Sequence, residues 1–183
     1  GIPHFCQSQN SAKTLKMIAA FDVHYINDEA TTACICFDDW TDSVSTQDFV
    51  EITHNVAPYE PGKFYKRELP CIISLLKKHN LQPEIIIVDG YVWLDENKIG
   101  LGGHLFNALG GNIPVIGVAK SKFALHSKVK EVFRGNSKNP LYVTAIGIDL
   151  DEAAQNIEKM DGIFRLPSLL KKVDQLCRGI VTI

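Results

Sequence analysis

The chain has 183 residues, of which 45% are hydrophobic and 22% charged, and its formal net charge is -2 at pH 7. This length and composition are typical of one soluble globular domain and exclude a disordered chain, a collagen and a coiled coil. No apolar stretch approaches the roughly 20 residues of a membrane span, and the near-neutral charge disfavours a protein that holds nucleic acid by bulk electrostatics alone.

The first half of the chain predicts three strands and then a helix. Residues 17–26 are apolar and β-prone, and a turn-like segment separates them from a second apolar run at residues 31–37, which predicts an antiparallel hairpin. Residues 47–54 predict a third strand. Prolines and a glycine make residues 58–62 a loop. Apolar side chains then recur at helical spacing over residues 64–79, with two lysines at the end where the helix dipole favours them.

The second half of the chain alternates strands with helices. Residues 84–88 are continuously apolar, which is the pattern of a strand covered on both faces. The elements expected after it are a helix at 99–109, strands at 114–118 and 141–148, and helices at 152–159 and 166–177. Hairpin strands followed by alternating strands and helices predict a mixed β-sheet flanked by helices. We therefore expect one α/β domain over residues 1–183, with residues 1–14 poorly ordered.

The cysteines indicate a reducing compartment. The chain has five, an odd number with no CxxC pair, and its six histidines show no zinc-site spacing. Cys34 and Cys36 share one face of a predicted strand, where core packing is the ordinary explanation. The first 13 residues also lack the apolar segment of a signal peptide. We expect a cytoplasmic monomer without a structural metal.

Three acidic residues stand at unusual places. Asp22 interrupts an apolar strand, Asp89 follows another, and Glu68 lies in the first turns of the helix after the proline loop. Each has an ordinary explanation alone: an edge position for Asp22, a cap or turn for Asp89, and a solvated helix face for Glu68. If they converge, three carboxylates form an oxygen site suited to Mg²⁺. The local pattern leaves both alternatives open.

Charge is unevenly distributed, and other catalytic motifs fail. Residues 120–138 contain six basic residues and one acid, whereas residues 38–51 contain five acids and no base. The basic stretch is either a solvated surface or, beside a carboxylate–metal site, a surface for a polyanion. The glycines at residues 100–103 do not complete a dinucleotide-binding loop, and neither a phosphate loop nor a serine nucleophile elbow is present.

Several short segments, in their order and spacing over about residues 18–177, resemble the endonuclease V family of repair nucleases that act on deaminated purines. The segments are Phe21-Asp22-Val23-His24-Tyr25, Pro58-Tyr59-Glu60-Pro61-Gly62, Arg67-Glu68-Leu69-Pro70, Ile87-Val88-Asp89-Gly90, Gly103-His104, Ile116-Gly117-Val118-Ala119-Lys120-Ser121 and Arg165-Leu166-Pro167.

The resemblance implies an RNase H-like fold and a catalytic site. By matching position, Asp22, Glu68 and Asp89 are the family's metal-binding carboxylates, which would hold Mg²⁺ or Mn²⁺. Lys120 matches an active-site lysine near the scissile phosphate, and Asp174 matches a fourth active-site residue.

The resemblance also implies a substrate-binding region. Pro58, Tyr59 and Pro61 match a wedge that enters the nucleic acid beside the damaged base. Gly90 matches a position near the pocket for the extruded base, and His104 falls in another matching segment of this region.

This chain also departs from the family pattern. Asp95-Glu96-Asn97-Lys98 stands where the family has a His-Pro-Arg-Arg run, and Tyr91-Val92-Trp93 replaces a small glycine-containing segment. A Ser-Pro-Gly-His-type turn is missing near Thr144. The metal-binding residues are therefore retained while the residues that read the substrate are altered.

We expect a Mg²⁺-dependent endonuclease that hydrolyses a phosphodiester bond 3′ to a deaminated base, inosine, in DNA or RNA. The alternative is a nucleic-acid-binding protein on the same fold with weak or no nuclease activity, which the missing Arg-Arg pair and the small net charge favour. An unrelated flavodoxin-like domain would need a phosphate loop after a strand, and the sequence has none. The choice between DNA and RNA is left open.

Overall fold

The fold is described from a computed structural model that covers residues 17–61, 63 and 65–180. The expectation for residues 1–14 therefore lies outside the described residues. None of the helices within the described part of the chain has the length and apolar character needed to cross a membrane.

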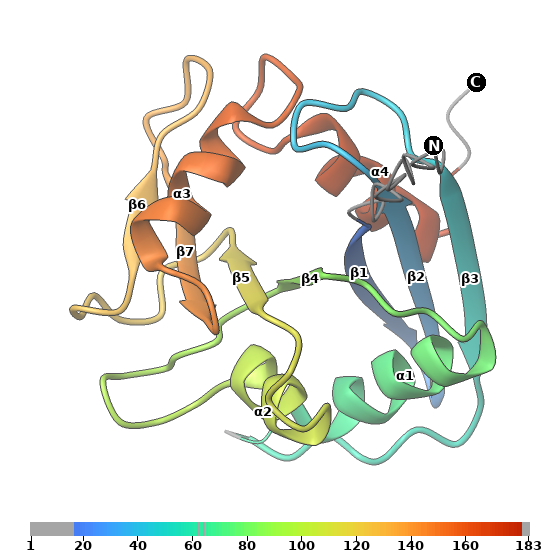
Figure 1. The fold of residues 1–183 in the computed structure, drawn as a ribbon. Coiled ribbons are helices and arrows are strands. Elements are labelled where there is room, and N and C mark those ends of the chain that lie inside the picture. Colours follow the sequence, from blue (N-terminus) through green and yellow to red (C-terminus); the bar gives the residue numbers. More distant parts are fainter. Residues whose placement is uncertain (1–16, 62, 64, 181–183) are drawn as a thin grey trace, which may run out of the picture.

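Over the residues that the structure describes, seven strands form one mixed sheet in the order β3-β2-β1-β4-β5-β7-β6 (Figure 1). The strands are β1 (Ile18–Ile26), β2 (Glu29–Phe37), β3 (Gln47–Thr53), β4 (Ile85–Asp89), β5 (Val115–Ala119), β6 (Lys130–Val132) and β7 (Leu141–Ile146). The central strands β1, β4 and β5 run parallel to one another, and the remaining neighbours pair antiparallel. The predicted hairpin of the first two strands and the mixed sheet are confirmed.

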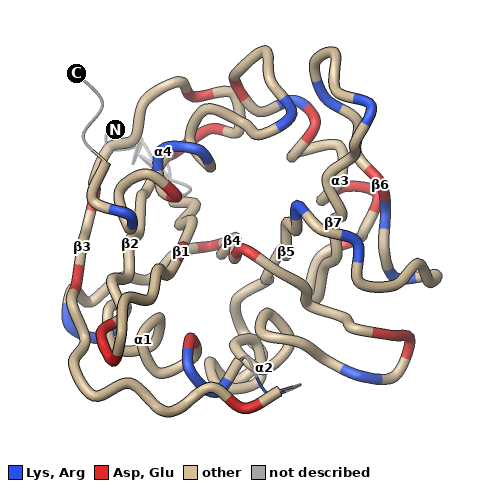
Figure 2. The backbone as a smooth tube through the Cα atoms, turned by 180° about the vertical axis from the view of Figure 1, so that it is seen from behind, with Lys and Arg blue, Asp and Glu red and all other residues tan. Residues whose placement is uncertain are grey.

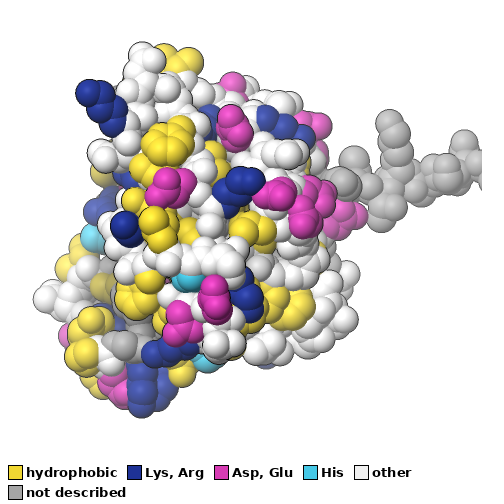
Figure 3. All heavy atoms as spheres, turned by 90° about the vertical axis from the view of Figure 1, so that its left-hand side faces the viewer, with side chains coloured by type: hydrophobic (Ala, Val, Ile, Leu, Met, Phe, Trp, Pro, Cys, Tyr) yellow, Lys and Arg dark blue, Asp and Glu magenta, His cyan; other side chains and the backbone are white. Residues whose placement is uncertain are grey.

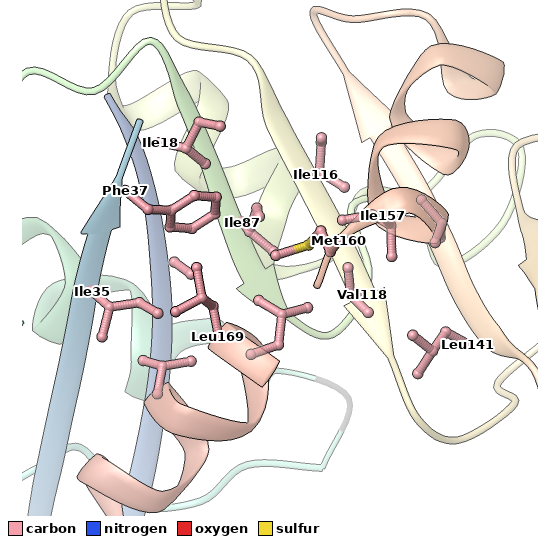
Figure 4. Packing of buried hydrophobic residues seen from close by; sticks show 14 of the residues in the cluster. Ile18, Ile35, Phe37, Ile87, Ile116, Val118, Leu141, Ile157, Met160 and Leu169 are labelled. Carbon is pink, nitrogen blue, oxygen red and sulfur yellow. The ribbon is translucent and has the colours of Figure 1, made fainter. Parts of the chain in front are cut away.

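Four helices cover the two faces of the sheet. They are α1 (Tyr65–Lys78), α2 (Leu101–Ala108), α3 (Leu150–Lys159) and α4 (Ser168–Cys177). Side chains of α1 and α2 pack with Ala19, Phe21 and Val88 on one face, whereas side chains of α3 and α4 pack with Ala20 and Ile87 on the other. Figure 4 shows this second cluster, with Leu169 and Met160 directed toward the strands. Successive strand residues thus alternate between the two helical layers.

The elements differ from the sequence predictions mainly at their ends. Asp89 is the last residue of β4 rather than the first residue after it, and α4 begins at Ser168. The short strand β6 was not predicted, because three residues show too little periodicity to be recognised. Cys34 and Cys36 are fully buried, as expected for core packing.

Arg134 is buried, with only 6% of its surface exposed. Its guanidinium donates hydrogen bonds to the carbonyl oxygens of five residues in and after α3, which are Glu158, Met160, Gly162, Phe164 and Arg165. A single charged group thus bonds five carbonyl groups of a connection that is itself largely exposed. Arg134 therefore ties the end of β6 to the α3–α4 connection.

The basic residues of segment 120–138 consequently do not form one basic surface. The expectation that they are exposed is wrong for Arg134. Lys130 is paired with Asp151, and the Lys128 ammonium lies 3.7 Å from the centre of the Trp93 ring. Figure 3, which faces this side of the molecule, shows basic, acidic and hydrophobic side chains intermingled. Local charge counts cannot distinguish a solvated cation from one that is satisfied inside the fold.

Replacing Arg134 by methionine should lower the free energy of unfolding by roughly 3 kcal/mol, because it removes five hydrogen bonds of a buried charged group. Urea denaturation measures the change. Lys138→Met, the same substitution at an exposed position, is the matched control and should change stability by less than about 0.5 kcal/mol. Equal stability of the two variants would contradict the structural role of Arg134.

Candidate active site

The central parallel strands place Asp22 and Asp89 side by side. The register pairs Phe21 of β1 with Val88 of β4, so the two aspartates follow at neighbouring positions. Because strand residues alternate, both carboxyl groups lie on the same face of the sheet as Ala20 and Ile87, beneath α4. Figure 2 shows acidic positions of β1 and β4 next to each other at the middle of the sheet, with a basic position beside β5.

Helix α4 adds a further acid to this place. It packs its apolar side against β1 and β2, and this brings Asp174 close to Asp22. One carboxylate oxygen of Asp22, one of Asp174 and Sγ of Cys177 all lie within 4.8 Å of one another. Asp89 and Glu68 are not part of this set. Asp174 therefore lies next to Asp22 in the structure.

Glu68 reaches the cluster from the other helical layer. It is buried in α1, with 6% of its surface exposed, so it is not a solvated helix acid. Burial raises its pKa well above the ordinary value, and the charges of Asp89 and Asp22 raise it further. The neighbouring Arg67 has the opposite effect on this pKa and lies 4.0 Å from the centre of the Tyr25 ring.

Burial, and to a smaller extent neighbouring charges, perturb the pKa values of the two strand aspartates. Burial raises the pKa of Asp22 to about 8, and Asp89 and Asp174 contribute to the increase, while a hydrogen bond from the Val23 amide opposes it. Asp89 keeps an exposed surface, yet the protein around it also raises its pKa, against the charge of Lys120. Such a group of acids must take up protons or a cation.

Two cations hold Asp174. The Lys120 ammonium lies 3.7 Å from its Oδ1 atom, and Nε of Arg178 donates a hydrogen bond to the same oxygen at 3.0 Å. Burial alone would raise the pKa of Asp174, but the hydrogen bond from Arg178, the contact with Asp22 and the Lys120 charge together lower it. The contact between the two acids thus raises the pKa of Asp22 and lowers that of Asp174.

A pocket opens between these groups. Its polar lining is Asp22, Asp89 and Lys120, and its remaining lining is apolar: Phe21, Ile87, Val88, Val118, Leu166, Leu170 and Val173. Apolar walls strengthen electrostatic interactions inside the pocket because they exclude water. Three of the residues predicted to act in catalysis therefore face one small volume.

The segments after the strands are held by side chains that the sequence analysis did not assign. The Arg165 guanidinium donates hydrogen bonds to the carbonyl oxygens of Lys120 and Pro140, and this fixes the backbone of the lysine. The Tyr91 hydroxyl donates to the Ser121 carbonyl and accepts from the Phe123 amide. The aromatic residue that departs from the family pattern thus supports the segment that carries Lys120.

The predicted wedge residues lie apart from this pocket in an exposed loop before α1, where 60% of the Tyr59 surface is exposed together with Pro58 and Pro61. Gly90 directly follows Asp89 and has a φ of +127°, a conformation that favours glycine. The space beside its α-carbon is open. Gly90 is therefore adjacent to the carboxylate pocket.

His104 is not brought to the carboxylates. Its ring stacks on that of Tyr65, with centres 3.6 Å apart, and burial lowers its pKa. The two rings line a second pocket together with Lys63, Leu94, Asn97, Lys98 and Ile99. Part of the segment that replaces the His-Pro-Arg-Arg run therefore borders His104.

Cys177 and Arg178 are site residues that the sequence analysis missed. They follow Asp174 at helical spacings of three and four, so both lie on its side of α4. That spacing was available once Asp174 had been assigned. A cysteine in an amphipathic helix ordinarily indicates core packing, however, and an arginine near the helix end ordinarily indicates a solvated cation.

The model of the endonuclease V family matches residues 4–175. The chain belongs to the endonuclease V family. It is 28% identical over 183 residues to an endonuclease V of Geotalea uraniireducens, across 89% of this chain and 77% of that protein. A Streptomyces avermitilis endonuclease V is 28% identical over 142 residues, and the chain spans 61% of its length.

Solved structures of endonuclease V have the same fold. The Ciona intestinalis protein, in complex with a 24mer DNA containing an inosine followed by a ribo-adenosine, matches with a TM-score of 0.75 at 20% identity, over 92% of this chain and 87% of that one. Human ENDOV matches with a TM-score of 0.73 at 19% identity, over 91% and 84%. The predictions of the family and of an RNase H-like fold are confirmed.

Without divalent cations, the stability of the protein should fall as pH rises from about 4 to 8. The pKa of Asp22 rises from 3.8 to about 8 on folding, so within this window the folded state binds more protons than the unfolded state. Asp22→Asn removes this acid and should stabilise the metal-free protein at pH 8 by roughly 1–3 kcal/mol.

Thermal unfolding at several pH values, with a chelator present, measures this effect. Asp28→Asn, at an exposed turn position, is the control and should follow the unmodified protein. A metal-free stability that rises steadily from pH 4 to 8 would contradict the raised pKa of Asp22.

Proposed function

We propose that this chain is a Mg²⁺-dependent endonuclease that hydrolyses a phosphodiester bond 3′ to a deaminated base, inosine, in DNA or RNA. The observation that carries the proposal is geometric: Asp22 and Asp89 hold neighbouring positions on the parallel strands β1 and β4, and Asp174 lies beside Asp22. Burial of Asp22, with Asp89 and Asp174 beside it, also raises its pKa. A carboxyl cluster of this kind is suited to binding a cation. Membership of the endonuclease V family supports phosphodiester hydrolysis as the reaction, and the Ciona intestinalis relative was crystallised with inosine-containing DNA.

Asp22, Asp89 and Glu68 would hold the metal ion, with Asp174 available beside Asp22. These residues fit Mg²⁺, because they supply hard oxygen ligands whose repulsion a cation relieves; Mn²⁺ shares this preference. When bound, the ion would stabilise charge on the scissile phosphate and lower the pKa of an attacking water.

Lys120 would bind the scissile phosphate. Its ammonium lies at the pocket, paired with Asp174 at 3.7 Å, and Arg165 holds its backbone in place. The side chain keeps 37% of its surface exposed, so it can exchange the carboxylate for a phosphate oxygen. Asp174 would then orient water or contact a second cation.

The wedge loop and the pocket near Gly90 would bind the modified base. Tyr59, which lies between Pro58 and Pro61 in the loop, is exposed. Its ring would fill the gap that the base leaves in the stack when it turns out. Gly90 leaves open space beside Asp89, where the base could lie near the carboxylates. His104 would contact the substrate through the second pocket, which it shares with Tyr65.

Asp22→Asn should lower Mg²⁺-dependent nicking of an inosine-containing oligonucleotide by about a hundredfold or more, because it removes a metal-binding carboxylate. A gel assay of nicking measures the loss, and circular dichroism checks that the variant folds. Asp28→Asn is the matched control and should retain activity.

Undiminished nicking by Asp22→Asn would refute the metal site. If the unmodified protein binds inosine-containing strands but cleaves none of them in Mg²⁺ or Mn²⁺, the alternative of a nucleic-acid-binding protein on this fold replaces the nuclease. The cytoplasmic location and the monomeric state stay predictions from the sequence.

Tyr59→Ala should reduce nicking of inosine in a duplex by roughly tenfold or more, because a stacking side chain contributes about 1–3 kcal/mol per base. Nicking of the same strand without its complement should change much less, since fewer stacked pairs must be separated. Tyr59→Phe retains the ring and is the control. Equal losses on duplex and single strand would argue against a wedge.

A further inference from the structure

A buried thiol lies beside the carboxylates. Sγ of Cys177 and a carboxylate oxygen of each of Asp22 and Asp174 lie within 4.8 Å of one another, and 3% of the Cys177 surface is exposed. Sγ donates to the backbone carbonyl of Asp174 at 3.1 Å, so the side chain points along the helix face that carries this acid. Cys34 and Cys36, in contrast, pack in the cluster beneath α1 on the opposite face of the sheet.

Sulfur changes which cations this place can bind. Mg²⁺ is bound by oxygen ligands, whereas a thiolate favours soft cations such as Zn²⁺ and Cd²⁺. One thiolate and two carboxylates make three protein ligands, which is the number that an open zinc site uses. The ligand atoms of Asp22, Asp174 and Cys177 all lie within 4.8 Å of one another, which is close enough for one cation to contact all three.

We propose that Asp22, Asp174 and Cys177 form a binding site for a soft divalent cation, Zn²⁺ or Cd²⁺. The Cys177 thiol loses its proton to solvent as the sulfur–metal bond forms. The site shares Asp22 with the proposed Mg²⁺ site, so the soft cation excludes the functional ion and inhibits the nuclease. Only this inhibition rests on the proposed function; binding itself does not.

The thiol is shielded from solvent. Burial and, to a smaller extent, the charges of Asp22 and Asp174 raise the pKa of Cys177 to about 12. A cation that binds the sulfur must therefore have a high affinity for it, because it has to displace the thiol proton. Lys120 and Arg178 both pair with Oδ1 of Asp174, so an entering cation competes with them for this carboxylate.

Cadmium titration tests the site without any measurement of activity. The full chain, freed of metal, is titrated with Cd²⁺ while the ultraviolet charge-transfer band of cadmium thiolate is recorded. Cys6 lies outside the described residues, so every protein carries Cys6→Ser. We expect a band that saturates with one cadmium per chain.

Cys177→Ser should abolish this band and weaken cadmium binding by about tenfold or more. Cys177→Ala is a second variant if serine impairs folding. Cys34→Ser, at another buried cysteine, is the matched control and should keep the band. Asp22→Asn should keep the band but require about tenfold more cadmium to produce it.

Three results would overturn the site: no band in the unmodified background, a band that survives Cys177→Ser, or a band lost in Cys34→Ser. Unchanged cadmium affinity in Asp22→Asn would show that Asp22 is not a cadmium ligand. The two cation sites would then share no residue, and the expected inhibition would be refuted. A cadmium site that depends on Cys177 in a chain that nicks no inosine-containing strand would support this inference and refute the proposed function.

Discussion

The burial of several carboxyl groups in one place is the constraint on which the rest of this site depends. Asp22 and Asp89 are neighbours on parallel strands, Glu68 approaches from α1, and Asp174 approaches from α4. Apolar side chains surround the acids, and burial is the largest cause of the raised pKa of Asp22. In a packed core this arrangement is unfavourable unless a proton or a cation accompanies it. The buried acids therefore lower the stability of the metal-free fold, and a bound cation offsets this loss.

The backbone around the acids is held by polar side chains that do not themselves line the pocket. Arg165 fixes the carbonyl of Lys120, and Tyr91 fixes Ser121 and Phe123 in the same segment. Arg134 bonds five carbonyl groups in and after α3 and so supports the connection to the helix that carries Asp174. Each of these bonds joins segments far apart in the chain, which gives the site a rigid frame.

Much of the fold was predictable because it depends on local periodicity. Continuous apolar runs identified β4 and β5, and helical spacing identified α1 and α4 to within a few residues. The strand β6 was too short to show a period. Arg134 was counted as part of a basic stretch, because charge along a chain carries no information about burial. His104 matched the family by position, yet the fold places it in a second pocket with Tyr65.

The sequence by itself determined the order of the elements, the family and the identity of the three acids whose positions are unusual for charged residues. Period-two alternation also required Asp22 to share a face with Ala20. Only the tertiary structure decided which groups meet. The strand order places β1 beside β4, and the docking of α4 brings Asp174 and Cys177 to Asp22. Asp22 lies 67 positions from Asp89 and 152 from Asp174 in the sequence. No local pattern encodes contacts over such separations, because strand pairing and side-chain packing between layers determine them.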